Sequence, residues 1–222
     1  MMFDLVIFDF DGVLVDSEIL ACQVWADKLT ELGFPVTLKE MVTKYTGQTV
    51  TQMKQMLETR FEKTLPEDYL PTINARVEEL FAEKLVAVDG AVDFLNALTC
   101  PYCIASGSTG RVIGDCLRYT GLDAYFSLKK VFSAWDVPHG KPAPDVFLYA
   151  AREMNVPPEK CLVIEDSVAG VTAGKAAGMT VFGFCGGSHC PPAHADVLKN
   201  AGADEIFSSF ADMRKAMGQP SS

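Results

Sequence analysis

Short apolar runs alternate with amphipathic segments of helix length along most of the chain. The segments between the runs, such as 145–155 and 167–178, have helical periodicity. The runs are apolar on both faces and predict strands at 4–10, 102–106, 130–133, 161–164, 180–184 and 205–207. Strands that are buried on both faces and joined by helices form parallel sheets. The pattern therefore predicts an α/β fold in which helices cover both faces of a parallel sheet.

The interval between the first and second predicted strands breaks this alternation. Residues 16–86 contain several amphipathic helical stretches and no strand pattern. The first stretch ends at Gly33, with Pro35 close behind, which is a common way for a helix to end. Two interpretations stay open, an extended helical crossover and an inserted all-helical domain. An insertion at the carboxyl end of a strand would lie over the ligand crevice of an open α/β sheet.

Two predicted strands end in acidic pairs. Asp9 and Asp11 close the first strand, followed by Gly12, and Glu165 and Asp166 close the fourth. Residues i and i+2 of a strand point to the same side, so the carboxylates of Asp9 and Asp11 would repel each other. A shared proton or a hard cation such as Mg²⁺ relieves that repulsion. The alternative is that both aspartates are simply solvated at the strand end.

Two further segments carry polar side chains at the ends of predicted strands or before helices. Ser106-Gly107-Ser108 closes the second strand, and its N–H groups and hydroxyls suit an anion. For Ser108 and Thr109 we favour an ordinary strand-to-helix turn in which one of them is the helix N-cap. Lys141 lies in the loop HGKPAPD, where a lysine is usually solvated.

Composition limits the classes of partner and compartment. The 222 residues are 49% hydrophobic and 22% charged, enough for one sizeable domain carrying a smaller insertion. A net charge of −10 argues against nucleic acid and against anionic membrane surfaces as partners. No segment has the apolar length of a membrane span or a signal peptide. The seven cysteines, an odd number, favour a reducing compartment, so we expect a cytoplasmic protein.

The segment Cys100-Pro101-Tyr102-Cys103 has the CxxC spacing of dithiol redox proteins. In such proteins the first cysteine lies at a helix N-terminus, where the helix dipole stabilises its thiolate. Here the pair follows a helical stretch and leads into a strand, so the dipole would present its negative end. A redox protein is therefore a distant alternative, and buried packing of these cysteines is favoured.

A second group of cysteines and histidines raises the question of zinc. Cys185, His189, Cys190 and His194 have spacings that can form a tetrahedral site. Their segment, however, predicts a strand end followed by a Gly/Pro loop, without a second clustered arm. We therefore favour loop side chains that bind no metal.

The polar strand ends occur in an order that resembles the haloacid dehalogenase (HAD) superfamily. The matching stretches are DFDGVLVDSE, ASGS, GKPAPD and IEDSVAG, and the resemblance covers the whole chain. Each motif is short, but four in this order are specific. The resemblance implies a Rossmann-like catalytic core made of 1–15 and 87–222. It also implies an all-helical cap domain at 16–86 that selects the substrate.

The resemblance also implies the catalytic roles. Asp9 is similar to the family's nucleophile, which attacks phosphorus and forms an aspartyl-phosphate. Asp11 resembles the general acid and base, which protonates the leaving alcohol and then activates water. Lys141 matches the lysine that offsets charge between nucleophile and phosphate.

Binding roles follow from the same resemblance. The family's Mg²⁺ is held by carboxylates and one backbone carbonyl, and its phosphoryl oxygens by a serine and an adjacent N–H group. In this chain the implied metal ligands are Asp9, the Asp11 carbonyl, Asp166 and, close by, Glu165. The implied phosphate ligands are Ser106 and Gly107.

The residues narrow the reaction class within the superfamily. Dehalogenases and phosphonate hydrolases of the family lack an acid at the position of Asp11, so both are disfavoured. Enzymes similar to β-phosphoglucomutase carry a histidine and an arginine where this chain has Ala21 and Val50. Hydrolysis is therefore favoured, and a phosphomutase is the alternative.

The substrate is expected to be a small phosphorylated metabolite. The resemblance is greatest to phosphatases of sugar phosphates such as phosphogluconate. Gln48 and Thr49 of the cap are candidates to hydrogen-bond sugar hydroxyls, although both also fit an exposed helix start. The expected assembly is a monomer or a homodimer.

Overall fold

The computed structural model describes residues 3–218, which form two compact units. Residues 3–16 and 86–218 make the core unit, and Ser17–Leu85 make the helical unit. The sequence predicted a helical insertion over 16–86. The division of catalysis and substrate selection between the two units stays a prediction. Among the described helices, none is long and apolar enough to cross a membrane.

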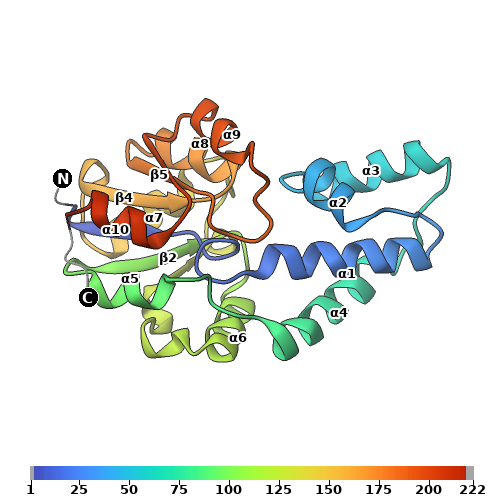
Figure 1. The fold of residues 1–222 in the computed structure, drawn as a ribbon, viewed down its shortest axis with the longest axis horizontal. Helices are drawn as coiled ribbons and strands as arrows, with labels where there is room; N and C mark the ends of the chain where they lie inside the picture. The colour runs from blue at the N-terminus through green and yellow to red at the C-terminus, as the bar shows by residue number, and fades with distance from the viewer. Residues whose placement is uncertain (1–2, 219–222) are drawn as a thin grey trace. The chain divides into compact units, whose positions relative to one another are not determined.

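The core unit is built on a six-stranded parallel sheet (Figure 1). Its strands are β1 (Leu5–Phe8), β2 (Tyr102–Ser106), β3 (Val131–Ser133), β4 (Cys161–Glu165), β5 (Thr180–Phe184) and β6 (Glu205–Phe207). All residues of β1 and β4 are fully buried, as continuous apolar runs require. The predicted α/β fold with a parallel sheet is confirmed.

Helices and short helical turns connect these strands. The α-helices of the core unit are α5 (Ala91–Ala97), α6 (Gly110–Thr120), α7 (Asp145–Glu153), α8 (Val168–Ala176), α9 (His194–Asn200) and α10 (Phe210–Ala216). Its 3₁₀ turns are η2 (Leu122–Ala124), η3 (Leu128–Lys130), η4 (Ala134–Asp136) and η5 (Pro158–Lys160).

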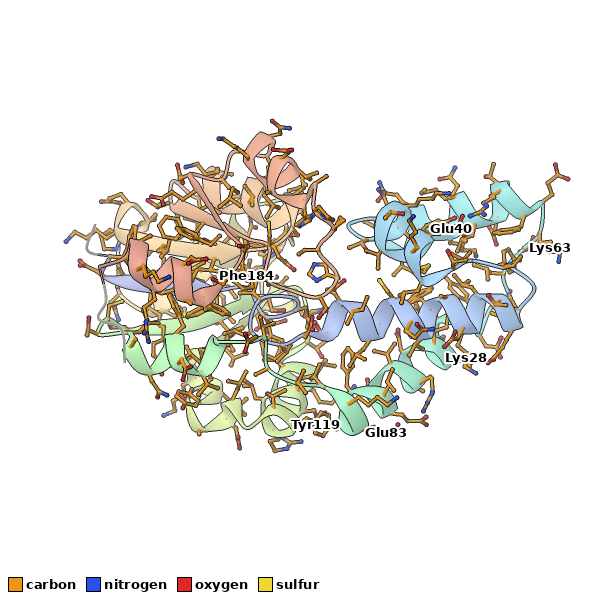
Figure 2. The ribbon with its side chains drawn as sticks, viewed as in Figure 1. Lys28, Glu40, Lys63, Glu83, Tyr119 and Phe184 are labelled. Atoms are coloured by element: carbon orange, nitrogen blue, oxygen red, sulfur yellow. The ribbon has the colours of Figure 1, made fainter. Side chains whose placement is uncertain are left out.

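Side chains of β1 alternate between the two faces of the sheet. Leu5 and Ile7 belong to a buried cluster that also contains apolar residues of α7 and α8. Phe8 points to the other face, where its ring packs edge to face on Phe94 of α5 at 6.0 Å between centroids. On that face Phe184 of β5, labelled in Figure 2, packs on α10. Both faces of the sheet are therefore covered, as predicted.

The strand order places the carboxyl ends of the central strands together. The order across the sheet is β3-β2-β1-β4-β5-β6, so the chain reverses its direction of winding at β1. Phe8 of β1 is in register with Ile104 of β2 and with Ile164 of β4. In open α/β sheets, ligands bind beyond the carboxyl ends at such a switch point. The residues that follow β1, β2 and β4 are therefore positioned to form a site.

The helical unit contains the rest of the described elements. These are α1 (Ser17–Glu31), α2 (Leu38–Glu40), the π-helical turn η1 (Met41–Tyr45), α3 (Val50–Phe61) and α4 (Tyr69–Lys84). The unit has its own apolar cluster, in which Leu29 and Leu57 are fully buried. On its surface Glu40, labelled in Figure 2, pairs with Lys44 at 3.0 Å and with Arg60 at 2.9 Å.

Candidate functional site

Asp9 lies immediately beyond β1, at the reversal point of the sheet. Its N–H group donates to the Ile164 carbonyl of β4 at 2.9 Å, and its side chain is buried. Gly12 then turns the chain with φ of +77°, a conformation that suits glycine. A Cβ atom at Gly12 would lie 2.0 Å from Asp166 Oδ2, so glycine is also required for this close approach.

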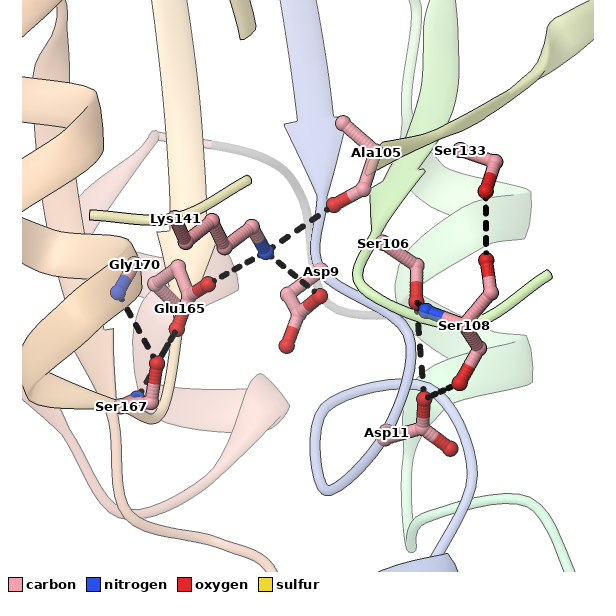
Figure 3. Close-up of polar contacts among 10 residues, drawn as sticks. All are labelled: Asp9, Asp11, Ala105, Ser106, Ser108, Ser133, Lys141, Glu165, Ser167 and Gly170. Atoms are coloured by element: carbon pink, nitrogen blue, oxygen red, sulfur yellow. Dashed lines mark hydrogen bonds and ion pairs between the residues drawn. The ribbon is translucent and has the colours of Figure 1, made fainter. Parts of the chain in front are cut away.

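Lys141 joins three elements at this edge of the sheet (Figure 3). Its Nζ atom donates to Asp9 Oδ1 at 2.8 Å, to Glu165 Oε1 at 2.6 Å and to the Ala105 carbonyl at 3.1 Å. The lysine that the sequence placed in a loop is therefore not solvated: its side chain is only 10% exposed, and its three donors have acceptors from β2 and from the ends of β1 and β4.

Glu165 is held on both of its carboxylate oxygens. Oε1 accepts from Lys141, and Oε2 accepts from the Ser167 N–H group at 2.8 Å and from its hydroxyl at 2.9 Å. Gly170, in the first turn of α8, leaves the room that this carboxylate occupies, since a Cβ atom there would lie 1.6 Å from Oε1. Glu165 is thereby fixed as the partner of Lys141.

The electrostatics of the cluster follow from burial. Burial raises the pKa of Asp9 well above its usual range, and the neighbouring Glu165 carboxylate raises it further. The pKa of Asp166 is raised well above its usual range for the same two reasons. Burial lowers the pKa of Lys141, but Asp9 and Glu165 raise it by more, so its net shift is upward and the lysine stays protonated.

This arrangement suits a hard cation. Carboxylate oxygens of Asp9, Glu165 and Asp166 lie within 4.8 Å of one another, and all three residues are buried. Lys141 contacts Asp9 and Glu165, which leaves excess negative charge at the cluster. Oxygen donors with excess negative charge are the ligands that Mg²⁺ binds in proteins. The donor set therefore fits a hard cation such as the expected Mg²⁺.

Asp11 turns toward different partners from those of Asp9 (Figure 3). The Ser108 hydroxyl donates to Asp11 Oδ2 at 2.7 Å, and the Ser106 hydroxyl lies 3.5 Å from the same oxygen. Ser106 Oγ in turn accepts from the Ser108 N–H group at 3.0 Å. The two aspartates therefore occupy different environments although they are two residues apart.

Sequence reasoning missed the role of Ser108. Thr109 is the N-cap of α6, accepting from the Val112 N–H group, which leaves the Ser108 hydroxyl to contact Asp11. The Ser108 carbonyl accepts from the Ser133 hydroxyl of β3 at 2.8 Å. A small hydroxyl residue two positions beyond the end of β2 was the available signal, but the same signal also fits a helix cap.

The sequence indicated His189 only as a possible zinc ligand. In the structure it lies beside Asp166. Its Nε2 atom is 3.0 Å from Asp166 Oδ2, and its side chain is 4% exposed. Glycines make room for the ring, because a Cβ atom at Gly12 or Gly187 would lie within 2.8 Å of its atoms. The segment after β5 therefore contributes to the same edge of the sheet.

Gln48 and Thr49 belong to the helical unit. Thr49 is the N-cap of α3 and forms a reciprocal capping box with Gln52, whose side-chain oxygen accepts from the Thr49 N–H group at 2.9 Å. Gln48 lines a groove of about 590 Å³ together with polar residues that include Lys44, Gln52 and Arg60. Thr49 therefore has a structural role on α3, and Gln48 faces a groove.

The two cysteines of the CxxC segment, Cys100 and Cys103, are free thiols with no sign of a redox pair. Cys103 lies in β2 and belongs to the buried cluster beneath α7. Burial raises the pKa of Cys103 and also that of Cys100, which disfavours both thiolates. Neither forms a disulfide.

Comparison with known proteins gives consistent matches. A family model described as haloacid dehalogenase-like hydrolase matches residues 3–178. The 6-phosphogluconate phosphatase of Escherichia coli K12 is 32% identical over 188 residues, which cover 84% of this chain and 85% of that protein.

Two solved structures extend the likeness to the fold. A conserved haloacid dehalogenase-like protein of unknown function from Agrobacterium tumefaciens superposes with a TM-score of 0.91 at 38% identity, covering 97% of this chain and 98% of that one. A putative β-phosphoglucomutase from Thermotoga maritima superposes with a TM-score of 0.74 at 27% identity, covering 96% of this chain and 99% of that one.

Proposed function

The chain belongs to the haloacid dehalogenase-like hydrolases, and from this membership we propose the Mg²⁺-dependent hydrolysis of a sugar phosphate through an aspartyl-phosphate on Asp9. The enzyme class is that of a phosphoric monoester hydrolase. The observation that carries the proposed mechanism is the contact of Lys141 with both Asp9 and Glu165, beside Asp166.

Asp9 is the proposed nucleophile. A carboxylate oxygen of Asp9 attacks phosphorus, and the bond from phosphorus to the sugar oxygen breaks. A negative nucleophile and negative phosphoryl oxygens repel each other, so the site must supply positive charge before attack. Lys141 supplies part of it, and its contact with Asp9 Oδ1 orients the nucleophile. Bound Mg²⁺, held by Asp9, Asp166 and the Asp11 carbonyl, would neutralise further charge.

Asp11 is the proposed general acid and base. Its protonated carboxyl donates to the leaving sugar oxygen in the first step. In the second step its carboxylate takes a proton from water. That water attacks phosphorus, the bond to Asp9 breaks, and inorganic phosphate leaves. The Ser108 hydroxyl holds Asp11 Oδ2, so that this carboxyl is oriented independently of Asp9.

Ser106 and Gly107 are proposed to bind the transferred phosphoryl group. Ser106 is fully buried at the end of β2, with its hydroxyl near Asp11. A Cβ atom at Gly107 would meet no atom within 4 Å, so there is open space for a ligand beside its backbone. Backbone N–H groups and hydroxyls at such a strand end suit anionic oxygens.

Glu165 is proposed to position Lys141. The sequence placed it among the metal ligands, and its carboxylate does belong to the acidic cluster. Both of its oxygens, however, already accept hydrogen bonds from Lys141 and Ser167. Direct contact of Glu165 with Mg²⁺ stays a prediction.

A sugar phosphate is the proposed substrate because the Escherichia coli relative is a 6-phosphogluconate phosphatase. The helical unit is proposed to select the substrate. Of the two predicted substrate contacts we prefer Gln48, since it lines a groove together with Gln52 and Arg60, whereas Thr49 caps α3.

A phosphomutase is the second candidate, favoured by the likeness to the putative β-phosphoglucomutase. Ala21 and Val50 stand where such mutases have histidine and arginine, so we prefer hydrolysis. A mutase would convert a sugar phosphate to its isomer with a bisphosphate activator, without net release of phosphate.

One assay separates these proposals. A panel of sugar phosphates, including 6-phosphogluconate, is incubated with enzyme and Mg²⁺, and both inorganic phosphate and isomerised sugar phosphate are measured. We expect phosphate release that EDTA abolishes and that Asp9→Asn lacks. Release that is unaffected by EDTA would overturn the metal-dependent mechanism, and isomerisation without release would favour the mutase. Substantial turnover by Asp9→Asn would exclude Asp9 as the nucleophile.

A further inference from the structure

A cluster of nitrogen and sulfur donors lies in the segment after β5. It consists of His189, Cys190 and His194, and one ligating atom of each lies within 4.8 Å of those of the other two. Cys190 Sγ is 3.5 Å from His189 Nε2. His189 is buried, and the other two are half-buried. The proposed phosphatase chemistry uses none of the three.

Asp166 adds a potential ligand from a second chain segment, which the sequence pattern did not indicate. It follows β4, and its Oδ2 atom is 3.0 Å from His189 Nε2. The same His189 nitrogen therefore lies close to both the carboxylate of Asp166 and the thiol of Cys190. Potential ligands from two separate chain segments therefore meet at His189.

His194 makes a hydrogen bond of the kind that metal-binding histidines commonly make. Its Nε2 atom is 2.5 Å from the Asp166 carbonyl oxygen. A carbonyl only accepts, so Nε2 carries the proton, and in the neutral ring Nδ1 carries the lone pair. Histidines that bind metals commonly donate their other N–H group to a carbonyl or carboxylate in this way.

The spacings are close to those of a tetrahedral site. Zinc bonds of about 2.0 Å to nitrogen or oxygen and about 2.3 Å to sulfur place the ligands of a tetrahedron about 3.3–3.6 Å apart. The observed separations are 3.5 Å from Cys190 to His189 and 3.0 Å from His189 to Asp166. These two separations lie within about 0.3 Å of the tetrahedral values.

We propose that His189, Cys190 and His194, with the Asp166 carboxylate, form a binding site for a borderline-soft divalent cation such as Zn²⁺. Imidazole and thiolate donors favour Zn²⁺ over Mg²⁺, which takes oxygen ligands. On binding, the Cys190 S–H bond breaks and its proton passes to solvent, while the proton that His189 Nε2 directs at Asp166 moves to Nδ1, so that Nε2 offers its lone pair; zinc–sulfur and zinc–nitrogen bonds form. Loss of that proton works against binding, so the affinity should be lower than that of structural sites with several thiolates.

Zinc at this cluster should inhibit the enzyme. Asp166 is also a proposed Mg²⁺ ligand, so a zinc ion that takes Asp166 Oδ2 removes that ligand from Mg²⁺. This consequence rests on the proposed function. The existence of the zinc site does not, because it can be measured by binding alone.

Binding is tested first, on the intact enzyme, by calorimetric titration with Zn²⁺ and by Co²⁺ absorption, in which a thiolate ligand gives a charge-transfer band. We expect Cys190→Ala to weaken Zn²⁺ binding at least tenfold and to abolish the band. Cys100→Ala is the matched control, another half-buried cysteine outside the cluster, and should behave as wild type. If Cys190→Ala fails to fold, His194→Asn should weaken binding by a similar factor. Unchanged binding and an unchanged band in the variant that folds would overturn the site.

Inhibition is tested second, by titrating Zn²⁺ into the phosphatase assay at fixed Mg²⁺. We expect wild type to lose activity and Cys190→Ala to need at least tenfold more Zn²⁺ for the same loss. Equal sensitivity of the two proteins would overturn the sharing of Asp166. A wild-type enzyme that binds Zn²⁺ through Cys190 yet hydrolyses no sugar phosphate with Mg²⁺ would instead contradict the proposed function and support the site.

Discussion

Gly170→Ala tests whether Glu165 must stay in place to hold Lys141. The added Cβ atom would lie 1.6 Å from Glu165 Oε1 and 1.8 Å from its Cδ. The carboxylate cannot turn away without cost, because Oε1 is bound to Lys141 at 2.6 Å and Oε2 to the Ser167 N–H group at 2.8 Å. We therefore expect this substitution to break the Lys141–Glu165 pair.

The magnitude follows from two opposing effects. Breaking a buried ion pair costs about 3–5 kcal/mol, and here Glu165 would be left as a buried charge without its cation. Alanine is favoured over glycine inside a helix by about 1 kcal/mol. The free energy of unfolding should thus fall by about 2–4 kcal/mol. Lys141 would also lose a partner that positions it, and a displacement of about 1 Å in an active site costs about 100-fold in rate.

Urea unfolding followed by circular dichroism measures the stability, and phosphate release measures kcat/KM. Gly114→Ala in α6 is the matched control, since its Cβ atom would meet Leu128 at an ordinary 3.5 Å. That variant should gain about 0.5–1 kcal/mol and keep its activity. Adding Gly170→Ala to Glu165→Ala should cause no further loss of stability and should gain up to about 1 kcal/mol, because the clash is then absent and alanine is favoured over glycine in a helix. A Gly170→Ala protein with wild-type stability and kcat/KM would refute this reasoning.

Three further outcomes are expected. Ser108→Ala should lower kcat about tenfold with little change in KM, because Asp11 loses a hydrogen bond to a charged group, which contributes about 1.5–3 kcal/mol. An unchanged kcat would mean that Ser108 does not orient Asp11. In EDTA the melting temperature should fall as the pH rises above about 4, the usual pKa of an aspartate in an unfolded chain. Burial raises the pKa of Asp9 and Asp166, so the folded protein binds their protons more tightly than the unfolded chain does. Excess Mg²⁺ should flatten this dependence, and a rise with pH in EDTA would contradict it. Thr49→Ala should destabilise the helical unit by about 1 kcal/mol through loss of its cap and leave KM within about twofold; a large KM increase at unchanged stability would support substrate contact instead.

Much of the fold could be predicted because it depends on local patterns. The strand predicted at 102–106 matches β2 (Tyr102–Ser106), and the one at 180–184 matches β5 (Thr180–Phe184). Apolar residues on both faces of a short run require burial on both sides, and helix-length connections require parallel pairing. The order of strands across the sheet depends on how these segments pack together, and the alternation alone does not specify it.

The partners of the polar side chains depended on tertiary structure. Lys141 is 132 residues from Asp9 along the chain, and Ser108 is 97 residues from Asp11. Local sequence favoured a solvated lysine and a helix cap for these two residues. Partial burial reverses both expectations, because a cation or carboxylate that loses part of its hydration must find partners in the protein.

The sequence by itself determined which residue types end the buried strands, and so where catalysis was to be expected. The tertiary structure decided which of them meet. It placed Glu165 against Lys141, separated the environments of Asp9 and Asp11, and brought His189 to Asp166. The physical reason is that a strand buried on both faces must be apolar along its length, and this composition can be read from the segment itself. Contacts at the edge of the sheet depend on the register and turns of several distant segments at once.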